Sequence, residues 1–299
     1  MIISELMGVR LGVDIGGTLT KFLVLDNGEK VYMDSFPTPK ESPEALIDFI
    51  VDIYTDLNRS FKIERIGIGT PGIVKNGSVY AENLPVHNVP VCELLRKRID
   101  KPITLDNDAN CATLAEAKLY NSEYANLVMI TIGTGIGGGI VLDGKIRRGK
   151  GGMGEIGHMV VEATNGLPCP CGNKGCWEQY ASTTALVKKA EQAAINNPDS
   201  YLYNSYRLTQ RLNGKLLFDA IRNDCPVAIK ILSEYLDILA IGIKSLVYIL
   251  DPEVIVLAGG ITKDGDMFID ELRKRVNMDV KLEISTLQNE AGAYGAAML

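Results

Sequence analysis

Apolar residues gather in two similar segments of the chain, in which short runs of Val, Leu and Ile are interrupted by glycine. The first runs from Val9 to Leu25 and breaks at Gly16-Gly17-Thr18. The second runs from Leu127 to Lys145, and a shift of 117 residues places Ile15-Gly16 on Ile132-Gly133. Each pattern predicts a strand-turn-strand hairpin. Their recurrence predicts an internal repeat in the fold.

Other periodicities predict alternating strands and helices. Apolar residues at helical spacing follow Ser42-Pro43-Glu44, a typical start of a helix, which we expect to cover a sheet. Buried strands are predicted within 64–74, at the start of 102–119 and within 252–262, and a helix should begin at Asn107-Asp108. Helices are also expected at 183–197, 216–224 and 226–249, and the small apolar residues of 291–299 predict a docked terminal helix.

The segment from Gly154 to Ser182 is the richest in candidate chemistry. Cys169, Cys171 and Cys176 form a C-x-C-x4-C pattern, and His158 precedes them. One imidazole and three thiolates suit tetrahedral zinc. The intervening glycines and prolines forbid a long helix or strand, so a bound metal is the expected clamp of this loop. Glu155 and Glu178 flank the ligands without their spacing, which leaves two carboxylates for the hydroxyls of a polyol.

Two other interpretations of this segment are weaker. Three cysteines of one loop leave one unpaired if two form a disulfide, and nothing marks the chain as secreted. The close spacing of Cys169, Cys171 and Cys176 also argues against their being buried, inert thiols. Cys92, Cys111 and Cys225 lack such spacing, and we expect these three to be buried thiols.

The glycine-rich turns suggest phosphate binding. Adjacent glycines let backbone N–H groups approach an anion, and Asp14, just before the first turn, is a candidate ligand of hydrated magnesium. A tight turn with an acidic residue is the alternative for this turn alone. Together the two turns predict a nucleotide triphosphate site, and Gly259-Gly260 is a candidate contact for its adenine or ribose. A simple strand-to-helix turn is the alternative for Gly259-Gly260. The Walker A pattern is absent from the sequence.

Several polar residues lie near the predicted strand ends. Asp108 is the strongest candidate for a catalytic base, although an acid at a helix start also serves as a cap. Asn83 is able both to donate to and to accept from a sugar hydroxyl. The loop at Gly69-Thr70-Pro71-Gly72 either places backbone beside a ligand or is a plain strand exit, and His87 receives no role.

Length and charge narrow the class of protein. The chain has 299 residues, 46% hydrophobic and 23% charged, enough for two domains with separate cores and a cleft between them. A net charge of −6 argues against a nucleic-acid-binding face. No secretory leader is recognised and no segment approaches about eighteen uninterrupted apolar residues, so we expect a cytoplasmic protein without a membrane partner.

Six motifs in order resemble the ROK (repressor, open reading frame, kinase) family of sugar kinases and regulators. They are DIGGT at 14–18, NDAN at 107–110, TIGTGIGGG at 131–139, EIGH at 155–158, CPCGNKGCWE at 169–178 and LAGGI at 257–261. The resemblance covers the whole chain. It implies an α/β, actin-like or hexokinase-type (ribonuclease H-like) duplicated fold with two lobes and an interlobe cleft. We expect one lobe at 1–118 plus 287–299 and the other, with the zinc loop, at 119–286.

The resemblance also implies roles. Asp108 would be the general base, and Asn83, Asn107, Glu155, His158 and Glu178 would bind the sugar. His158, Cys169, Cys171 and Cys176 would bind structural zinc, so His158 would serve metal and sugar with one ring nitrogen each. ATP and Mg²⁺ are the expected cofactors. Their candidate residues are Asp14, Gly16, Gly17, Thr18, Gly133, Thr134, Gly135, Gly259 and Gly260.

The expected activity is ATP-dependent phosphorylation of the 6-hydroxyl of a hexose, with glucose favoured by the EIGHM and CWEQYAS segments. An N-acetylmannosamine or N-acetylglucosamine kinase is the alternative with the same catalytic residues. A regulator would need a DNA-binding segment ahead of Asp14, and a structural actin-like protein has no need of the predicted base and zinc ligands. Relatives are often dimers or tetramers. The chain departs from the family pattern at His87, Asp106 and Pro170. The first of these bears on the floor of the sugar pocket, so the identity of the substrate is the expectation that depends most on it.

Overall fold

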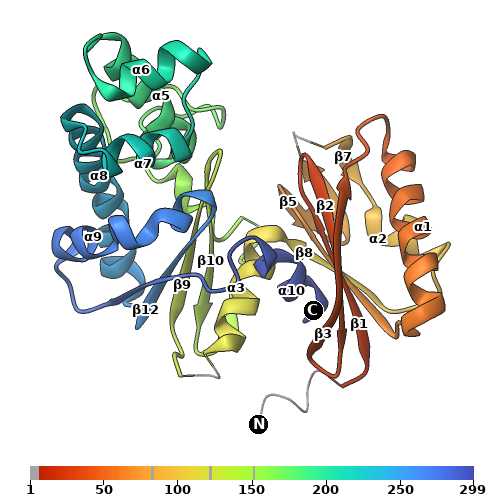
Figure 1. Cartoon of the computed structure of the whole chain (residues 1–299). Coiled ribbons are helices and arrows are strands. Elements are labelled where there is room, and N and C mark those ends of the chain that lie inside the picture. Colours follow the sequence, from red (N-terminus) through yellow and green to blue (C-terminus); the bar gives the residue numbers. More distant parts are fainter. Residues whose placement is uncertain (1–6, 82–83, 121–122, 151) are drawn as a thin grey trace. The chain divides into compact units, whose positions relative to one another are not determined.

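The computed structural model describes residues 7–81, 84–120, 123–150 and 152–299, and these form two compact units (Figure 1). Unit 1 comprises Met1–Leu127, Gly139–Gly154 and Asn289–Leu299. Unit 2 comprises Val128–Gly138 and Glu155–Gln288. The boundaries expected for the two lobes from the sequence stay a prediction.

Unit 1 is built on a mixed five-stranded sheet with the order β3-β2-β1-β4-β8. The first predicted hairpin is confirmed, because β1 (Val9–Ile15) and β2 (Leu19–Asp26) pair antiparallel with Asp14 opposite Lys21. The predicted buried strand is β4 (Arg65–Thr70), which runs parallel to β1. The sheet is completed by β3 (Glu29–Pro37) and β8 (Ile103–Asn107).

Helices cover both faces of this sheet, as the alternation of its side chains requires. The predicted helix α1 (Pro43–Phe61) begins at Ser42, whose hydroxyl accepts a hydrogen bond from the Ala45 N–H, and its apolar face packs on Leu11 and Val13. The terminal helix α10 (Ala291–Ala297) packs on the other face, against β1 and β4, and against α3 (Asp108–Leu119) (Figure 1). Both helices were predicted and both are confirmed.

The contact of α10 with the sheet is backbone against backbone. A Cβ atom on Gly67 of β4 would lie 1.7 Å from the Ala296 carbonyl oxygen. Glycine is therefore the residue that lets the terminal helix approach the strand this closely.

The second sheet repeats the strand order of the first, with the order β11-β10-β9-β12-β13. The second predicted hairpin is confirmed, since β9 (Leu127–Ile132) and β10 (Ile136–Leu142) are neighbours in this sheet. The predicted strand β12 (Val254–Ala258) pairs parallel with β13 (Lys281–Ile284). The edge strand β11 (Lys145–Ile146) completes the set. Two mixed five-stranded sheets with helices give the α/β, actin-like fold that the sequence predicted.

The helical region from α5 to α8 follows the predicted pattern with one addition. α5 (Thr183–Ile195), α7 (Gly214–Arg222) and α8 (Pro226–Leu250) were expected, whereas α6 (Tyr201–Thr209) was not. These helices share one apolar core with Val128, Ile130 and Ile255 of the sheet.

The strands β3, β11 and β13 of the two main sheets were not predicted, and neither were several further short elements. These short elements are β5 (Ile73–Lys75), β6 (Ser78–Ala81), β7 (Val86–Val89), α2 (Val91–Arg96), α4 (Glu178–Ala181), α9 (Ile269–Val276), and the 3₁₀ helices η2 (Ile156–His158), η3 (Gly260–Met267) and η4 (Gln288–Glu290). The strands β5, β6 and β7 form a separate three-stranded sheet.

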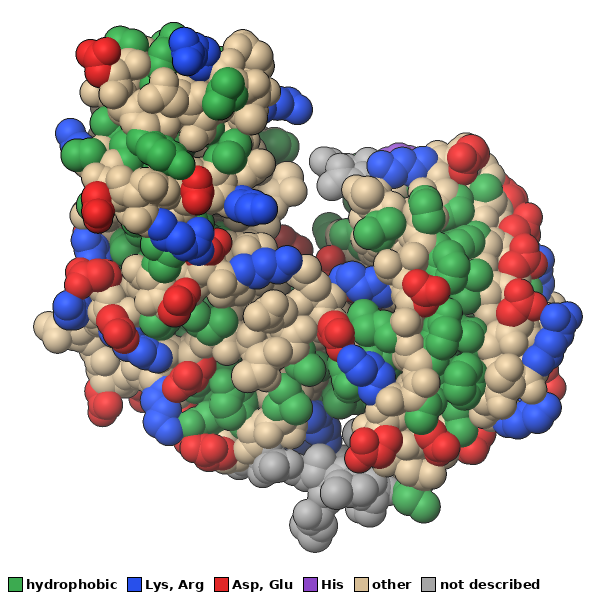
Figure 2. Space-filling model, viewed as in Figure 1, with side chains coloured by type: hydrophobic (Ala, Val, Ile, Leu, Met, Phe, Trp, Pro, Cys, Tyr) green, Lys and Arg blue, Asp and Glu red, His purple; other side chains and the backbone are tan. Residues whose placement is uncertain are grey.

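The surface carries charges of both signs. On the face shown in Figure 2, Lys and Arg side chains are interspersed with Asp and Glu. Among the described residues, no helix combines the length and the apolar character needed to cross a membrane.

Candidate active site and metal centre

The cysteine-rich loop folds back on itself as a small knuckle, which is defined here as residues 158–177. Met159 and Trp177 are joined by a 2.7 Å hydrogen bond from the Trp177 N–H to the Met159 carbonyl oxygen, and Val160 forms a bridge with Cys176. At the tip, the Cys169 N–H donates to the Asn173 carbonyl oxygen at 2.9 Å. These bonds bring His158 beside the three cysteines, as the sequence predicted.

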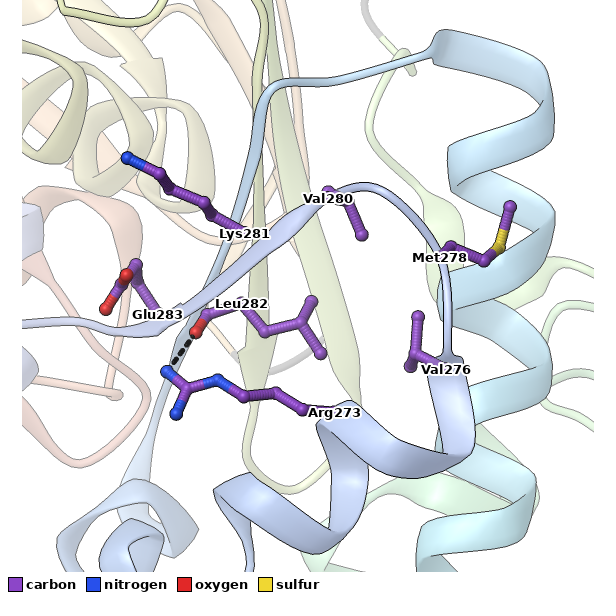
Figure 3. Close-up of a pocket in the computed structure, with 7 residues that line it drawn as sticks. All are labelled: Arg273, Val276, Met278, Val280, Lys281, Leu282 and Glu283. Carbon is purple, nitrogen blue, oxygen red and sulfur yellow. Dashed lines mark hydrogen bonds between the residues drawn. The ribbon is translucent and has the colours of Figure 1, made fainter.

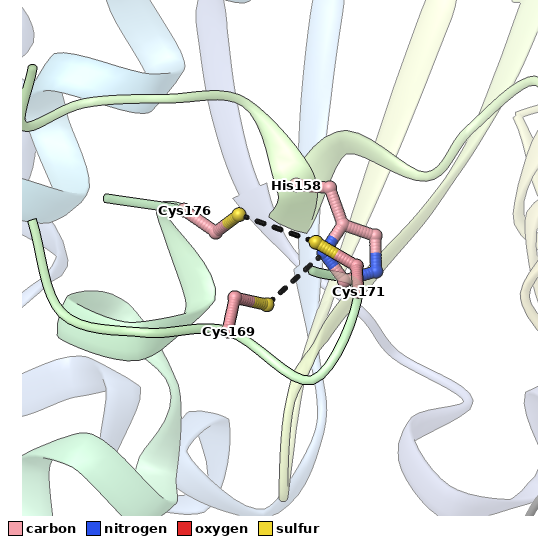
Figure 4. Close-up of side chains that lie close together, drawn as sticks. All are labelled: His158, Cys169, Cys171 and Cys176. Carbon is pink, nitrogen blue, oxygen red and sulfur yellow. Dashed lines mark hydrogen bonds between the residues drawn. The ribbon is translucent and has the colours of Figure 1, made fainter. Parts of the chain in front are cut away.

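The four predicted ligand side chains point toward one another (Figure 4). Their nitrogen and sulfur atoms all lie within 4.8 Å of one another. The Cys171 and Cys176 sulfurs are 3.6 Å apart, and the Cys169 sulfur is 3.6 Å from His158 Nδ1. Tetrahedral zinc, with bonds of about 2.3 Å to sulfur and about 2.1 Å to nitrogen, requires ligand separations of about 3.5–3.8 Å. The cluster fits zinc, whereas a disulfide requires sulfurs about 2.05 Å apart.

The thiols of the knuckle differ in acidity. Burial raises the pKa of Cys169 to about 12 and also raises the pKa of Cys176. A hydrogen bond from the Asn173 backbone lowers the pKa of the exposed Cys171. Since a metal binds thiolates, its binding must displace protons from the two buried thiols, and its affinity should fall as the pH falls.

The knuckle is fixed to the core of unit 2 by the one tryptophan of the chain. Trp177 is fully buried, and its Nε1–H donates to the Ile238 carbonyl oxygen of α8 at 3.1 Å. A Cβ atom on Gly242 of α8 would lie 2.1 Å from the indole ring. The residue after the last cysteine is thus packed directly on the longest helix.

Two carboxylates adjoin the metal ligands, as predicted for Glu155 and Glu178. Glu155 Oε2 is 3.9 Å from His158 Nε2, so the two ring nitrogens face different partners. Glu178 Oε1 is 3.3 Å from the Cys169 sulfur. Its other oxygen accepts a hydrogen bond of 3.4 Å from the Ile136 N–H, and a Cβ atom on Gly135 would lie 2.6 Å from it. Glu178 therefore joins the knuckle to the second glycine-rich turn.

The glycine-rich turns of unit 2 lie close together. A Cβ atom on Gly259 would lie 2.1 Å from the Ile132 carbonyl oxygen, next to Gly133, and Gly259 has a φ of 108°. Thr134 and Gly260 are exposed. The backbone of these two turns therefore meets at the ends of β9 and β12, where a ligand has access to it.

In unit 1, Asp14 and the turn after it are held by neighbours that the sequence analysis did not identify. Asp14 Oδ2 lies 3.0 Å from Lys21 Nζ, and Lys21 stands opposite it in the hairpin register. Counting across the predicted turn would have revealed this pair. The Thr38 hydroxyl donates to the Gly16 carbonyl oxygen at 2.7 Å. Gly17 is half-buried and Thr18 is exposed.

The predicted catalytic acid heads a helix. Asp108 is the first residue of α3 and is half-buried, and its Oδ1 accepts a hydrogen bond of 2.8 Å from the Ala109 N–H. Asn107 is the cap of α3, because its Oδ1 accepts hydrogen bonds from the N–H groups of Ala109 and Asn110. Its Nδ2 donates to the Gly72 carbonyl oxygen at 3.0 Å. Most of the hydrogen-bonding capacity of the Asn107 side chain is thus used within the protein. Asn83 lies outside the described residues.

A separate pocket of about 370 Å³ lies beside β13 and the end of α9 (Figure 3). None of the predicted site residues lines it; its walls are Arg273, Val276, Met278, Val280, Lys281, Leu282 and Glu283. The Arg273 guanidinium donates to the Leu282 carbonyl oxygen at 2.6 Å and to Asp270 Oδ1 at 2.9 Å, so its charge is already paired within the protein.

Comparisons with known proteins agree on one family. The family model described as "ROK family" matches residues 10–299. The glucokinase of Streptomyces coelicolor is 35% identical over 98% of each chain, and the N-acetyl-D-glucosamine kinase of Shigella boydii serotype 4 is 33% identical over 84% of each. The structure of a ROK family glucokinase from Streptomyces griseus in complex with glucose and AMPPNP has a TM-score of 0.84 and 31% identity, and covers 97% of this chain and 98% of that one.

Proposed function

This chain belongs to the ROK family, and we propose that it transfers the γ-phosphoryl group of ATP to the 6-hydroxyl of glucose. It is a sugar kinase and therefore an ATP-dependent phosphotransferase. The choice of glucose and the residue roles below are the proposal.

The observation that carries the proposal is the orientation of the His158 ring. Nδ1 lies 3.6 Å from the Cys169 sulfur, while Nε2 lies 3.9 Å from a Glu155 oxygen. Glu178 adjoins the same cluster. Nδ1 thus faces the cysteine cluster and Glu178, whose Oε1 is 3.8 Å away, whereas Nε2 faces Glu155. A pair of carboxylates beside one imidazole is suited to accept hydrogen bonds from neighbouring sugar hydroxyls.

The sugar and nucleotide residues are proposed on the pattern of the family. Glu155, His158, Glu178, Asn107 and Asn83 would bind the hydroxyls of glucose. Asp14 and the turns at Gly16-Gly17-Thr18, Gly133-Thr134-Gly135 and Gly259-Gly260 would bind ATP. Backbone N–H groups of such turns suit phosphate because they carry partial positive charge at close range.

Asp108 would act as the general base. Its carboxylate accepts the proton of the 6-hydroxyl as that oxygen approaches the γ-phosphorus, a contribution of about 10²–10⁴ to the rate. A negatively charged side chain suits the start of α3, because the helix dipole is positive there. Mg²⁺, when bound, neutralises phosphate charge, and Asp14 is the carboxylate offered to it.

His158, Cys169, Cys171 and Cys176 would hold zinc as a structural ion. Bound zinc supplies cross-linking of the knuckle. With all four positions filled by protein ligands, Glu155 and Glu178 keep fixed places around it, and the order of the knuckle becomes a condition for sugar affinity.

The test is a substrate panel. ADP release is measured with ATP and Mg²⁺ against glucose, mannose, N-acetylglucosamine and N-acetylmannosamine, beside zinc analysis of the same preparation. We expect the highest kcat/KM for glucose and about one zinc per chain. A preference of about tenfold or more for an N-acetylated sugar, roughly 1.4 kcal/mol in the transition state, would overturn glucose as the substrate.

An N-acetylhexosamine kinase is the second candidate. The 33% identity to the Shigella boydii N-acetyl-D-glucosamine kinase favours it. That match spans 84% of this chain, against 98% for the Streptomyces coelicolor glucokinase, so glucose is the better supported substrate.

A further inference from the structure

A buried carboxylate adjoins the proposed base and has no role in the proposed mechanism. Asp106 stands near the end of β8 and is only 4% exposed. Its Oδ1 accepts hydrogen bonds from the Asn107 N–H at 2.8 Å and from Asn110 Nδ2 at 3.0 Å. Its Oδ2 accepts one of 2.6 Å from Arg148 Nε. A charge this deeply buried persists only when it is paired and hydrogen-bonded.

These hydrogen bonds bracket Asp108. Asp106 holds Asn107, the residue before the proposed base, and Asn110, two residues after it. Asn107 in turn caps α3 through its own side chain. The backbone that carries the Asp108 carboxylate is therefore fixed on both sides by one buried acid.

The counter-charge comes from a distant part of the chain. Arg148 follows β11, 42 residues after Asp106, and belongs to the same unit. Its side chain is 49% exposed, so the guanidinium reaches in from the surface. The preceding residue, Arg147, makes an ion pair of 2.8 Å with Asp143, whose side chain is 83% exposed. The two adjacent arginines therefore make different ion pairs: Arg148 pairs with a buried carboxylate and Arg147 with an exposed one.

We propose that Arg148 is a positioning residue for phosphoryl transfer, because its ion pair with Asp106 fixes the first turn of α3 and with it the carboxylate of Asp108. The inference rests on the proposed role of Asp108 as the base. Without Arg148, the buried carboxylate of Asp106 loses its charged partner on Oδ2 and should turn toward water, which breaks the bracket around Asp108. A displacement of about 1 Å in a catalytic group costs about a hundredfold in rate.

The experiment compares Arg148→Gln with the matched control Arg147→Gln, using the sugar that wild type phosphorylates best. We expect Arg148→Gln to lower kcat by about tenfold to a hundredfold while KM for sugar and for ATP stays within about threefold. Amide hydrogen exchange at 107–111 should become faster in the same variant. Arg147→Gln should match wild type in both measurements.

Two rescue variants separate positioning from a general loss of folding. Arg148→Lys should recover part of kcat, because it restores the charge beside Asp106. Asp106→Asn combined with Arg148→Gln should have slower exchange at 107–111 than Arg148→Gln alone, because the unpaired charge is gone.

The outcomes are distinct. A rise in KM for ATP with unchanged exchange at 107–111 would show that Arg148 contacts the nucleotide, and would overturn the inference. An equal loss of kcat in the Arg147→Gln control would also overturn the inference. Two other results would contradict the proposed function rather than this inference: an inactive wild-type protein, or near-normal turnover of Asp108→Asn. Neither measurement involves an Arg148 variant.

Discussion

At the residue scale, three consecutive side chains at the junction of β8 and α3 differ in burial and in hydrogen-bond partners. Asp106 is buried and directs its oxygens at Asn107, Asn110 and Arg148. The side chain of Asn107 caps α3 and donates a hydrogen bond to the Gly72 carbonyl oxygen. Asp108 is half-buried, so of the two acids it is the more accessible to solvent.

Replacing Asp108 by Asn tests its role as the base. We expect kcat to fall by about 10²–10⁴ while KM for sugar changes little, since a proton is transferred only in the transition state. The measurement is ADP release under saturating ATP. Asp143→Asn, in an exposed turn, is the control and should keep wild-type turnover. Near-normal turnover of Asp108→Asn would remove the residue from this role.

How far single residues are predictable from the sequence depends on their separation. The cluster of His158 with three cysteines was predictable, because ligand types and short spacing limit the geometry to one loop. The pair of Asp14 with Lys21 required the hairpin register. The pair of Asp106 with Arg148 was beyond reach, since charges 42 residues apart meet only through the fold.

At the scale of elements, the contact of α10 with the sheet depends on glycine in the strands beneath it. Besides Gly67, Gly12 of β1 has no room for a side chain, since a Cβ atom there would lie 2.0 Å from the Ala293 carbonyl oxygen. The helix therefore packs through small residues, among them Ala293 and Ala296, which are fully buried.

The variant Gly67→Ala should destabilise the protein by about 1–3 kcal/mol, the usual cost of overpacking a tight contact. The added methyl meets backbone that cannot rotate away. Urea unfolding followed by circular dichroism measures the change. Gly214→Ala is the matched control, because a Cβ atom at Gly214 would meet nothing within 4 Å and alanine suits its helix. Equal stability of the two variants would contradict this account of the packing.

The long apolar strands and helices were predicted, whereas several short or sparsely buried elements were missed. Strands β1, β4 and β12 and helices α1 and α8 carry continuous or periodic apolar runs, because both faces of a central strand, or one face of a helix, are buried. The unpredicted strand β3 has no fully buried residue, since it lies at the sheet edge. The unpredicted helix α6 buries only Leu202, and its other leucine, Leu208, is exposed.

At the scale of the whole molecule, the two sheets have the same strand order, with the hairpin strands in the first three places. The shift of 117 residues between the glycine turns is the sequence counterpart of this repeat. The units differ in what they add: the knuckle and α5–α9 occur in unit 2, whereas α1 and α10 occur in unit 1. A duplicated scaffold with unequal additions explains why the repeat was visible only in the hairpins.

The knuckle is bonded to the core of its own unit through Trp177, so loss of zinc should act on unit 2 first. The free energy of metal binding contributes to the folding free energy of the segment that the metal closes. We expect a chelator to speed amide exchange across 158–177 and in α8 around Ile238, while exchange in β1 and β4 stays as it was. The emission of the single tryptophan should shift to longer wavelength as its packing loosens.

Thermal unfolding gives the size of this effect. A loss of about 1 kcal/mol lowers Tm by roughly 2–4 °C for a domain of about 150–250 residues, so the chelated protein should unfold at least about 3 °C lower. Adding zinc back should restore Tm and the emission spectrum. Cys171→Ser, at an exposed ligand, should reproduce the chelated state without a chelator, and the exposed Lys174→Ala in the same loop should not. Equal acceleration of exchange in β1 and in α8 would mean that the ion supports the whole chain rather than the unit that holds it.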